Sequence, residues 1–150
     1  MHLNKKLVFE TLTKSPNDLA PVADFLKTQI HEKVCFLLDG DLAAGKTTLV
    51  VEFCKQFGIY DVASPTFAIH HVYSGANLQI NHFDLYRLES VDEVETSGVW
   101  EVLSKPRSIT FIEWPQRLNV DDIPMDVKKY EVLIQKKSES EREVKIYQLS

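Results

Sequence analysis

The stretch "FLLDGDLAAGKTTLV", Phe36 to Val50, decides the fold, because it joins an apolar run to a glycine-bounded loop and then to a helix. The apolar run from Val34 to Leu38 is unbroken, which is typical of a strand buried on both faces of a parallel sheet. Apolar residues then recur at helical spacing from Leu49 to Phe57, and Gly58 is placed to end that helix. The sequence therefore predicts a strand, a loop and a helix in this order.

The loop "GDLAAGKT", Gly40 to Thr47, matches the phosphate-binding pattern G-x-x-x-x-G-K-[ST]. A chance match is expected on the order of once in 200 chains of this length. Backbone N–H groups in such a loop, with the N-terminus of the following helix, replace the water shell of a polyphosphate. We expect Lys46 to neutralise the β- and γ-phosphates and the Thr47 hydroxyl to ligate Mg²⁺. The predicted nucleotide contacts in this segment are Asp41, Leu42, Ala43, Ala44, Gly45, Lys46, Thr47 and Thr48.

Length and composition indicate one ordinary globular domain. The chain has 150 residues, of which 44% are hydrophobic and 26% are charged, and a net charge of −5. Phosphate backbones are usually bound by a basic face, so this charge argues against direct binding of DNA or RNA. A role on nucleic acid is therefore expected to act through a partner.

The N-terminal segment and the cysteines predict a cytoplasmic location. The segment "MHLNKKLVFETLTKS" lacks the apolar core of a secretory signal, and no segment is long enough to span a membrane. Cys35 lies in the predicted core strand and Cys54 on the apolar face of the predicted helix. We expect both to be buried free thiols, without a disulfide.

The remaining segments predict further strands and helices around the loop. In chain order these are a strand at Lys6–Leu12, a helix capped by Asn17 or Asp18, a hairpin of Phe67–Tyr73 and Leu78–Asp84, a short helix opened by Ser90, a strand at Ser108–Glu113, and a hairpin of Val127–Gln135 and Glu143–Leu149. The predicted fold class is therefore α/β. We expect a single P-loop NTPase domain over residues 1–150, with a mixed, mainly parallel central sheet flanked by helices and a C-terminal β-hairpin.

Two acidic residues at predicted strand ends are candidates for the metal site and for catalysis. Glu113 ends the apolar strand "SITFIE", and Asp84 follows the more polar run "INHFD". Parallel strands deliver such side chains to the ligand-binding edge of the sheet. Either residue alone could be a solvated acid, but a complete phosphate loop requires a carboxylate near Thr47. The sequence does not separate direct Mg²⁺ ligation from positioning of the attacking water.

Other polar and aromatic residues have two interpretations each. Thr66 in "SPTF" could meet the γ-phosphate or Mg²⁺, or belong to a polar turn before a strand. Trp114 could pack at a strand end or place its indole against the nucleotide. For His70, His71 and His82 a structural or surface role is favoured, because no Cys or carboxylate has the spacing of a zinc motif.

Four blocks, "GDLAAGKTTL", "SPTF", "HFDLYRL" and "IEWPQRL", lie in this order between Leu37 and Leu118. In this combination the chain resembles the bacterial TsaE family, formerly YjeE, the ATPase component of tRNA threonylcarbamoyladenosine (t6A) biosynthesis. Ala43 stands where the family usually has Gly, while Gly40, Gly45 and Lys46 are present.

The resemblance implies a P-loop ATPase that binds ATP or ADP with Mg²⁺ and is weakly active alone. It also implies partners related to TsaB and TsaD, which modify adenosine 37 of tRNA, with ATP hydrolysis resetting the complex between turnovers. The tRNA would be contacted through the complex. The site residues that the resemblance implies are Lys46 and Thr47 for phosphate and Mg²⁺, Thr66 for nucleotide sensing, Asp84 and Glu113 for the catalytic metal region, and Trp114 beside the nucleotide.

Two other functions fit a phosphate loop. A small-molecule P-loop kinase needs an acceptor pocket and usually an arginine-bearing lid, and no lid-like insertion is evident in the sequence. A GTP-dependent switch protein needs a guanine-reading N-K-x-D segment downstream of the loop. The nearest string, Asn4 to Leu7, lacks the Asp and lies upstream.

Overall fold

The computed structural model describes residues 4–15, 18–41, 44–62, 69–75 and 77–150. The strands are β1 (Lys5–Thr13), β2 (Lys33–Asp39), β3 (His70–Gly75), β4 (Leu78–Asp84), β5 (Ser108–Glu113), β6 (Lys128–Lys136) and β7 (Arg142–Leu149). The helices are α1 (Ala20–Thr28), α2 (Lys46–Lys55), α3 (Val91–Thr96) and α4 (Val99–Leu103), with 3₁₀ turns η1 (Pro115–Arg117) and η2 (Val120–Asp122).

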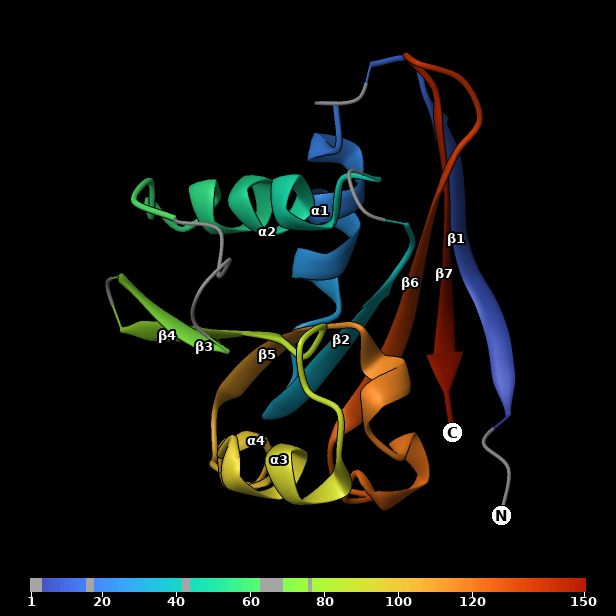
Figure 1. Cartoon of the computed structure of the whole chain (residues 1–150). Helices are drawn as coiled ribbons and strands as arrows, with labels where there is room; N and C mark the ends of the chain where they lie inside the picture. The colour runs from blue at the N-terminus through green and yellow to red at the C-terminus, as the bar shows by residue number, and fades with distance from the viewer. Residues whose placement is uncertain (1–3, 16–17, 42–43, 63–68, 76) are drawn as a thin grey trace.

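Over the described residues the strands form one seven-stranded sheet in the order β1-β7-β6-β2-β5-β4-β3. The pairs β6–β2, β2–β5 and β5–β4 are parallel, whereas β1–β7, β7–β6 and β3–β4 are antiparallel. The parallel pairs therefore form the centre of a mixed sheet, with antiparallel pairs on both sides. Helices α1 and α2 lie over one face, and α3 and α4 over the other (Figure 1).

Strand β2 supplies side chains to both hydrophobic cores. Val34, Phe36 and Leu38 belong to the cluster that includes α1 and α2. Cys35 and Leu37 belong to the cluster that includes α3 and α4. Successive side chains of a strand point to opposite faces, so an unbroken apolar run fills both layers. The prediction of a strand buried on both faces is confirmed.

Helix α2 ends as the sequence predicts. Gly58 has a φ of 74°, its N–H donates to the Lys55 carbonyl at 3.1 Å, and the Ile59 N–H donates to the Cys54 carbonyl at 3.1 Å. This pair of bonds is a Schellman motif, in which glycine takes the left-handed position without a Cβ penalty. The chain is thereby turned away from the helix axis.

The predicted cap of α1 is wrong for Asp18. The N-cap residue is Leu19 without a side-chain hydrogen bond, and the Asp18 N–H instead donates to the Ser15 carbonyl at 3.1 Å. Pro21 stands in the first turn of the helix and has no N–H that needs an acceptor. Asn17, the other candidate, lies outside the described residues.

The other elements follow the predicted order with shifted ends. Strand β5 has the predicted bounds, and Ser90 caps α3 by accepting from the Glu93 N–H. Strand β3 spans His70–Gly75. Its predicted start, Phe67, lies outside the described residues together with the rest of "SPTF". The C-terminal hairpin is formed by β6 and β7 as predicted.

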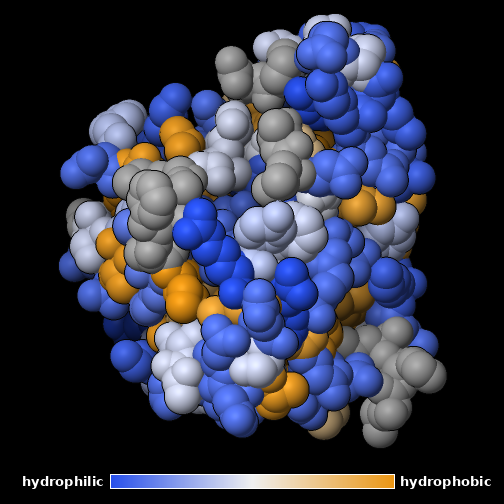
Figure 2. Space-filling view, viewed as in Figure 1, coloured by the Kyte–Doolittle hydropathy of each residue, from blue (hydrophilic) through white to orange (hydrophobic). Residues whose placement is uncertain are grey.

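The surface mixes polar and apolar side chains. Figure 2 shows apolar residues interspersed among hydrophilic ones on the face seen in Figure 1. Exposed apolar residues include Tyr60, Val91 and Met125, which come from separate parts of the chain. Scattered residues of this kind are usual on folded domains. No helix within the described ranges is long and apolar enough to cross a membrane.

We predict that neither cysteine reacts in the folded protein. Both are free and buried, and burial raises the pKa of Cys35 and of Cys54 to about 12. At pH 8 about one thiol in 10,000 is then ionised, and the thiolate is the nucleophile. A thiol-specific disulfide reagent should give no rapid signal in buffer and two equivalents in denaturant. Rapid labelling of either residue in buffer would contradict the described packing.

Candidate functional site

Three neighbouring strands end at the same level beside the phosphate loop. Leu38 of β2 pairs with Glu113 of β5, and Glu113 pairs with Asp84 of β4. Because the three strands are parallel, their carboxyl ends share one edge of the sheet, where ligands bind in open α/β folds. The register therefore brings both candidate acids to the exit of β2, where the loop begins.

The described glycines of the loop have backbone geometry that side chains rarely adopt. Gly40 has a φ of 154° and Gly45 a φ of 118°. A Cβ at Gly40 would also collide with the Ile134 carbonyl of β6. Gly40 is thus required both by conformation and by the close approach of a neighbouring strand. Gly45 is the N-cap of α2 and turns the loop into the helix.

Lys46 folds back over the loop. Lys46 is only 5% exposed, and its Nζ donates to the Gly40 carbonyl at 2.8 Å. The same Nζ lies 4.5 Å from the centre of the Trp114 ring, a cation–π distance. The ammonium group is therefore held between the start of the loop and the indole.

Glu113 is the hub of the polar contacts at the sheet edge. The residue is 4% exposed, and its Oε2 accepts from the Thr47 hydroxyl at 3.3 Å and lies 2.6 Å from His82 Nε2. His82 Nδ1 lies 3.2 Å from the Tyr73 hydroxyl. A carboxylate only accepts, so Nε2 carries the proton towards Glu113 and Nδ1 accepts from Tyr73 in the neutral imidazole. A continuous polar chain thus runs from β3 to the first turn of α2.

Asp84 is half-buried next to another acid. Burial raises the pKa of Asp84 above its ordinary value, and the Glu113 carboxylate raises it further. The Tyr86 backbone N–H donates to Asp84 Oδ1 at 3.0 Å, which lowers this pKa. The positive charge of Lys46 also lowers it. Two carboxylates brought together at a strand edge repel each other, and a bound cation relieves that repulsion.

The turn after β5 fixes Trp114. This residue has a φ of 60°, and its ring lies 4.8 Å from the Tyr86 ring. Gln116 Nε2 donates to Asp39 Oδ1 at 2.8 Å, and Arg117 donates to the Tyr86 carbonyl at 3.1 Å. The turn is therefore tied to the ends of both β2 and β4.

The structure brings together Lys46, Thr47, Glu113, Asp84 and Trp114, all of which the sequence analysis selected. Their roles towards a ligand remain predictions.

The other selected residues contribute less to this picture. Asp41 is exposed and its carbonyl accepts from the Ala44 N–H at 3.1 Å, while Thr48 is half-buried in the first turn of α2. Leu42, Ala43 and Thr66 lie outside the described residues.

Sequence reasoning missed the place of His82 in this site. The residue is fully buried and contacts Glu113 directly, so of the structural and surface roles that the sequence favoured, the structural role applies to His82. One signal was available: in "HFD" the His lies two residues before Asp84, and residues i and i+2 of a strand share a face. The partner of that face, Glu113, is set by the strand order.

The donors at this edge fit a magnesium–polyphosphate group. The Thr47 hydroxyl and the Glu113 and Asp84 carboxylates are the hard oxygen ligands that Mg²⁺ takes, and Lys46 matches phosphate charge. In the part of the chain that the structure describes, no acceptor is present for the Gly45 N–H, which opens the first turn of α2. Backbone N–H groups at a helix N-terminus donate well to anions.

The sheet, the glycine-bounded loop and α2 define an α/β protein with a P-loop NTPase-like fold. The crystal structure of YdiB from Bacillus subtilis has the same fold, with a TM-score of 0.69 at 22% identity over 98% of this chain and 88% of that one. The fold class predicted from the sequence is confirmed.

The family described as "Threonylcarbamoyl adenosine biosynthesis protein TsaE" matches residues 13–144, and the chain belongs to this family. A relative named tRNA threonylcarbamoyladenosine biosynthesis protein TsaE, from Borreliella burgdorferi, is 40% identical over 91 residues, which is 61% of this chain and 66% of the relative. The protein of the same name from Bacillus subtilis is 29% identical over 88% of this chain and 80% of its own length. The resemblance drawn from the four blocks is confirmed at the level of the family.

We predict that Trp114 reports nucleotide binding by fluorescence. When Lys46 leaves the indole to meet phosphate, the environment of Trp114 changes, so adding Mg-ADP should alter tryptophan emission. Trp114→Phe should remove most of the change. Trp100→Phe is the matched control, because Trp100 lies in α4, whereas the Trp114 ring lies against Lys46 Nζ. A change carried wholly by Trp100 would place the ligand elsewhere.

Proposed function

We propose that this chain binds ATP and ADP with Mg²⁺ and hydrolyses ATP within the machinery that makes t6A at position 37 of tRNA. Its partners in this proposal are homologues of TsaB and TsaD, and its location is the cytoplasm. The observation that carries the proposal is the convergence of Lys46, Thr47 and Glu113 at the opening of α2, in a chain of the TsaE family. A bound magnesium ion would supply charge neutralisation between the phosphate oxygens.

Each side chain at the loop has a stated task in this proposal. Lys46 exchanges the Gly40 carbonyl for phosphate oxygens, which is favourable because a charged acceptor binds an ammonium group more strongly than a carbonyl. The Thr47 hydroxyl, which donates to Glu113 in this structure, would help to hold a bound Mg²⁺. Glu113 and Asp84 would orient water or a bound Mg²⁺ at the sheet edge.

Partner dependence follows from the composition and from the site. A net charge of −5 disfavours a direct grip on tRNA, so tRNA is reached through the complex. The exits of β4 and β5 carry both acids and Trp114, and a protein closing over them would exclude water from the phosphates. Gating of this kind is a common way for a partner to control turnover.

Replacing Lys46 tests nucleotide binding. Lys46→Ala removes charge-assisted contacts worth roughly 1.5–3 kcal/mol, so affinity for Mg-ATP should fall about 10- to 100-fold. Calorimetry measures the change. Lys55→Ala, at the exposed far end of the same helix, is the matched control and should bind as the wild type does. Unchanged affinity in Lys46→Ala would reject Lys46 as a phosphate ligand.

Phosphate release with and without partners tests the function itself. The chain alone should turn ATP over slowly, and a TsaB–TsaD pair should raise the rate. Glu113→Gln should abolish that rise while nucleotide binding is largely kept, because the substitution removes the charge and keeps the size of the side chain. Glu10→Gln on exposed β1 is the control. Equal hydrolysis in both conditions, with sustained tRNA modification when this chain is omitted, would exclude the role.

A further inference from the structure

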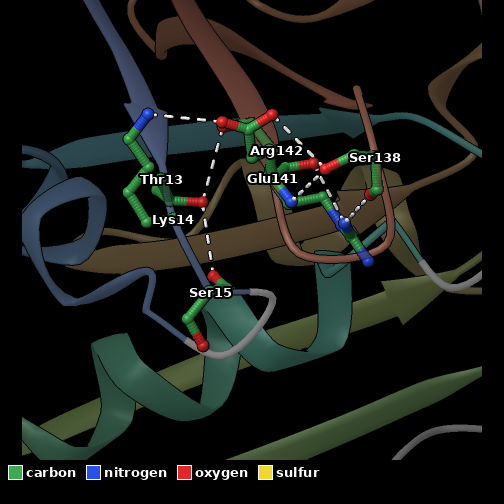
Figure 3. Close-up of polar contacts among 6 residues, drawn as sticks. All are labelled: Thr13, Lys14, Ser15, Ser138, Glu141 and Arg142. Carbon is green, nitrogen blue, oxygen red and sulfur yellow. Dashed lines mark hydrogen bonds and ion pairs between the residues drawn. The ribbon is translucent and has the colours of Figure 1, made fainter.

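Arg142, the first residue of β7, is a buried cation next to the phosphate loop. The residue is 5% exposed, and its Nε donates to the Ala44 carbonyl at 3.1 Å. Its Nη1 donates to the carbonyls of Ser138 and Glu141, each at 3.0 Å. Figure 3 shows Arg142 beside the turn that carries Ser138 and Glu141. These partners are backbone oxygens, and no described carboxylate forms an ion pair with the guanidinium.

The bond to Ala44 fixes the orientation of one peptide group of the loop. In a trans peptide the carbonyl and the following N–H point in opposite directions. Holding the Ala44 carbonyl towards Arg142 therefore turns the Gly45 N–H away from the hairpin. Among the described residues none accepts from this N–H, and a backbone N–H at the N-terminus of a helix is a donor that suits an anion.

The C-terminal hairpin touches the loop at a second point. The Ile134 carbonyl of β6 packs so closely on Gly40 that a Cβ there would collide with it. Strand β6 thus limits the start of the loop, and Arg142 of β7 holds its end. Both contacts come from residues far downstream of the loop, and Arg142 lies 98 positions after Ala44.

The neighbouring strand β1 anchors the turn that holds Arg142. The Thr13 hydroxyl donates to the Arg142 carbonyl at 3.4 Å, and Lys14 pairs with Glu141 at 3.2 Å (Figure 3). The Lys14 side chain is well exposed, so this ion pair contributes little by itself. The guanidinium, by contrast, joins the loop through a buried bond and the turn through partly buried bonds, which its planar set of N–H donors allows.

We propose that Arg142 is a positioning residue for the phosphate loop: it holds the Ala44–Gly45 peptide so that the Gly45 N–H faces the phosphates. Arg142 acts through the loop backbone and does not touch the nucleotide. The inference rests on the proposed binding of ATP and ADP. It names a determinant of affinity outside the loop motif.

Two substitutions separate the geometry of the Arg142 guanidinium from its charge. Arg142→Met removes both, and Arg142→Lys keeps the charge without the bridging geometry. We expect ADP affinity, measured by calorimetry well below the melting temperature, to fall about tenfold or more in Arg142→Met. The ADP affinity of Arg142→Lys should lie within about threefold of the affinity of Arg142→Met. The control is a substitution of Ile146, which is buried in β7. Of Ile146→Val and Ile146→Ala, we choose the variant whose melting temperature is closer to that of Arg142→Met.

The change in the NMR amide resonance of Gly45 on addition of ADP is a second measurement, which a general loss of stability does not alter. In the wild type ADP should shift this resonance strongly, because the N–H donates to phosphate. In both Arg142 variants the shift should be much smaller, while the Ile146 control keeps the wild-type shift. If Arg142→Met does not fold, Arg142→Lys carries the comparison.

The outcomes distinguish this inference from the function on which it rests. Wild-type protein that does not bind ADP would overturn the proposed function. Wild-type binding together with wild-type affinity and Gly45 shift in the Arg142 variants would overturn the positioning role alone. Full recovery in Arg142→Lys would also overturn it, because charge rather than geometry would then be the cause.

Discussion

The burial of β2 on both faces is the constraint on which the rest of the molecule depends. The strand pairs with β5 on one side and β6 on the other, and its side chains fill two cores. The backbone that leaves it at Gly40 is therefore fixed in position and direction. A phosphate loop binds through backbone N–H groups, so it needs a rigid starting point of this kind.

The same constraint creates an electrostatic conflict at the sheet edge. Parallel pairing of β2, β5 and β4 places Glu113 and Asp84 side by side, and the pKa of Asp84 is raised mainly by burial and further by the Glu113 carboxylate. Without a ligand the chain offsets part of this conflict internally, through Thr47, His82 and the nearby Lys46. A site whose charges are this poorly balanced by itself is suited to a cation and a polyphosphate together.

Residues outside the recognisable motifs hold the site in shape. His82 and Tyr73 orient Glu113 from β4 and β3, and the C-terminal hairpin limits the loop through the Ile134 carbonyl and Arg142. Buried polar groups of this kind destabilise the folded protein when they are unpaired, and they fix the conformation around them when they are fully paired. Both outer parts of the sheet therefore contact the central site, and the C-terminal hairpin helps to fix the loop as well as completing the sheet.

The sequence by itself determined strand β2, helix α2 and the two glycines that bound the loop between them, because these depend on local periodicity and on glycine conformation. It also determined the family, since four blocks in order are specific, and the bounds of β5. Only the tertiary structure decided that His82 contacts Glu113 and that Arg142 reaches Ala44. Those contacts depend on strand order and register, which join residues 31 and 98 positions apart, and the local sequence does not specify either partner.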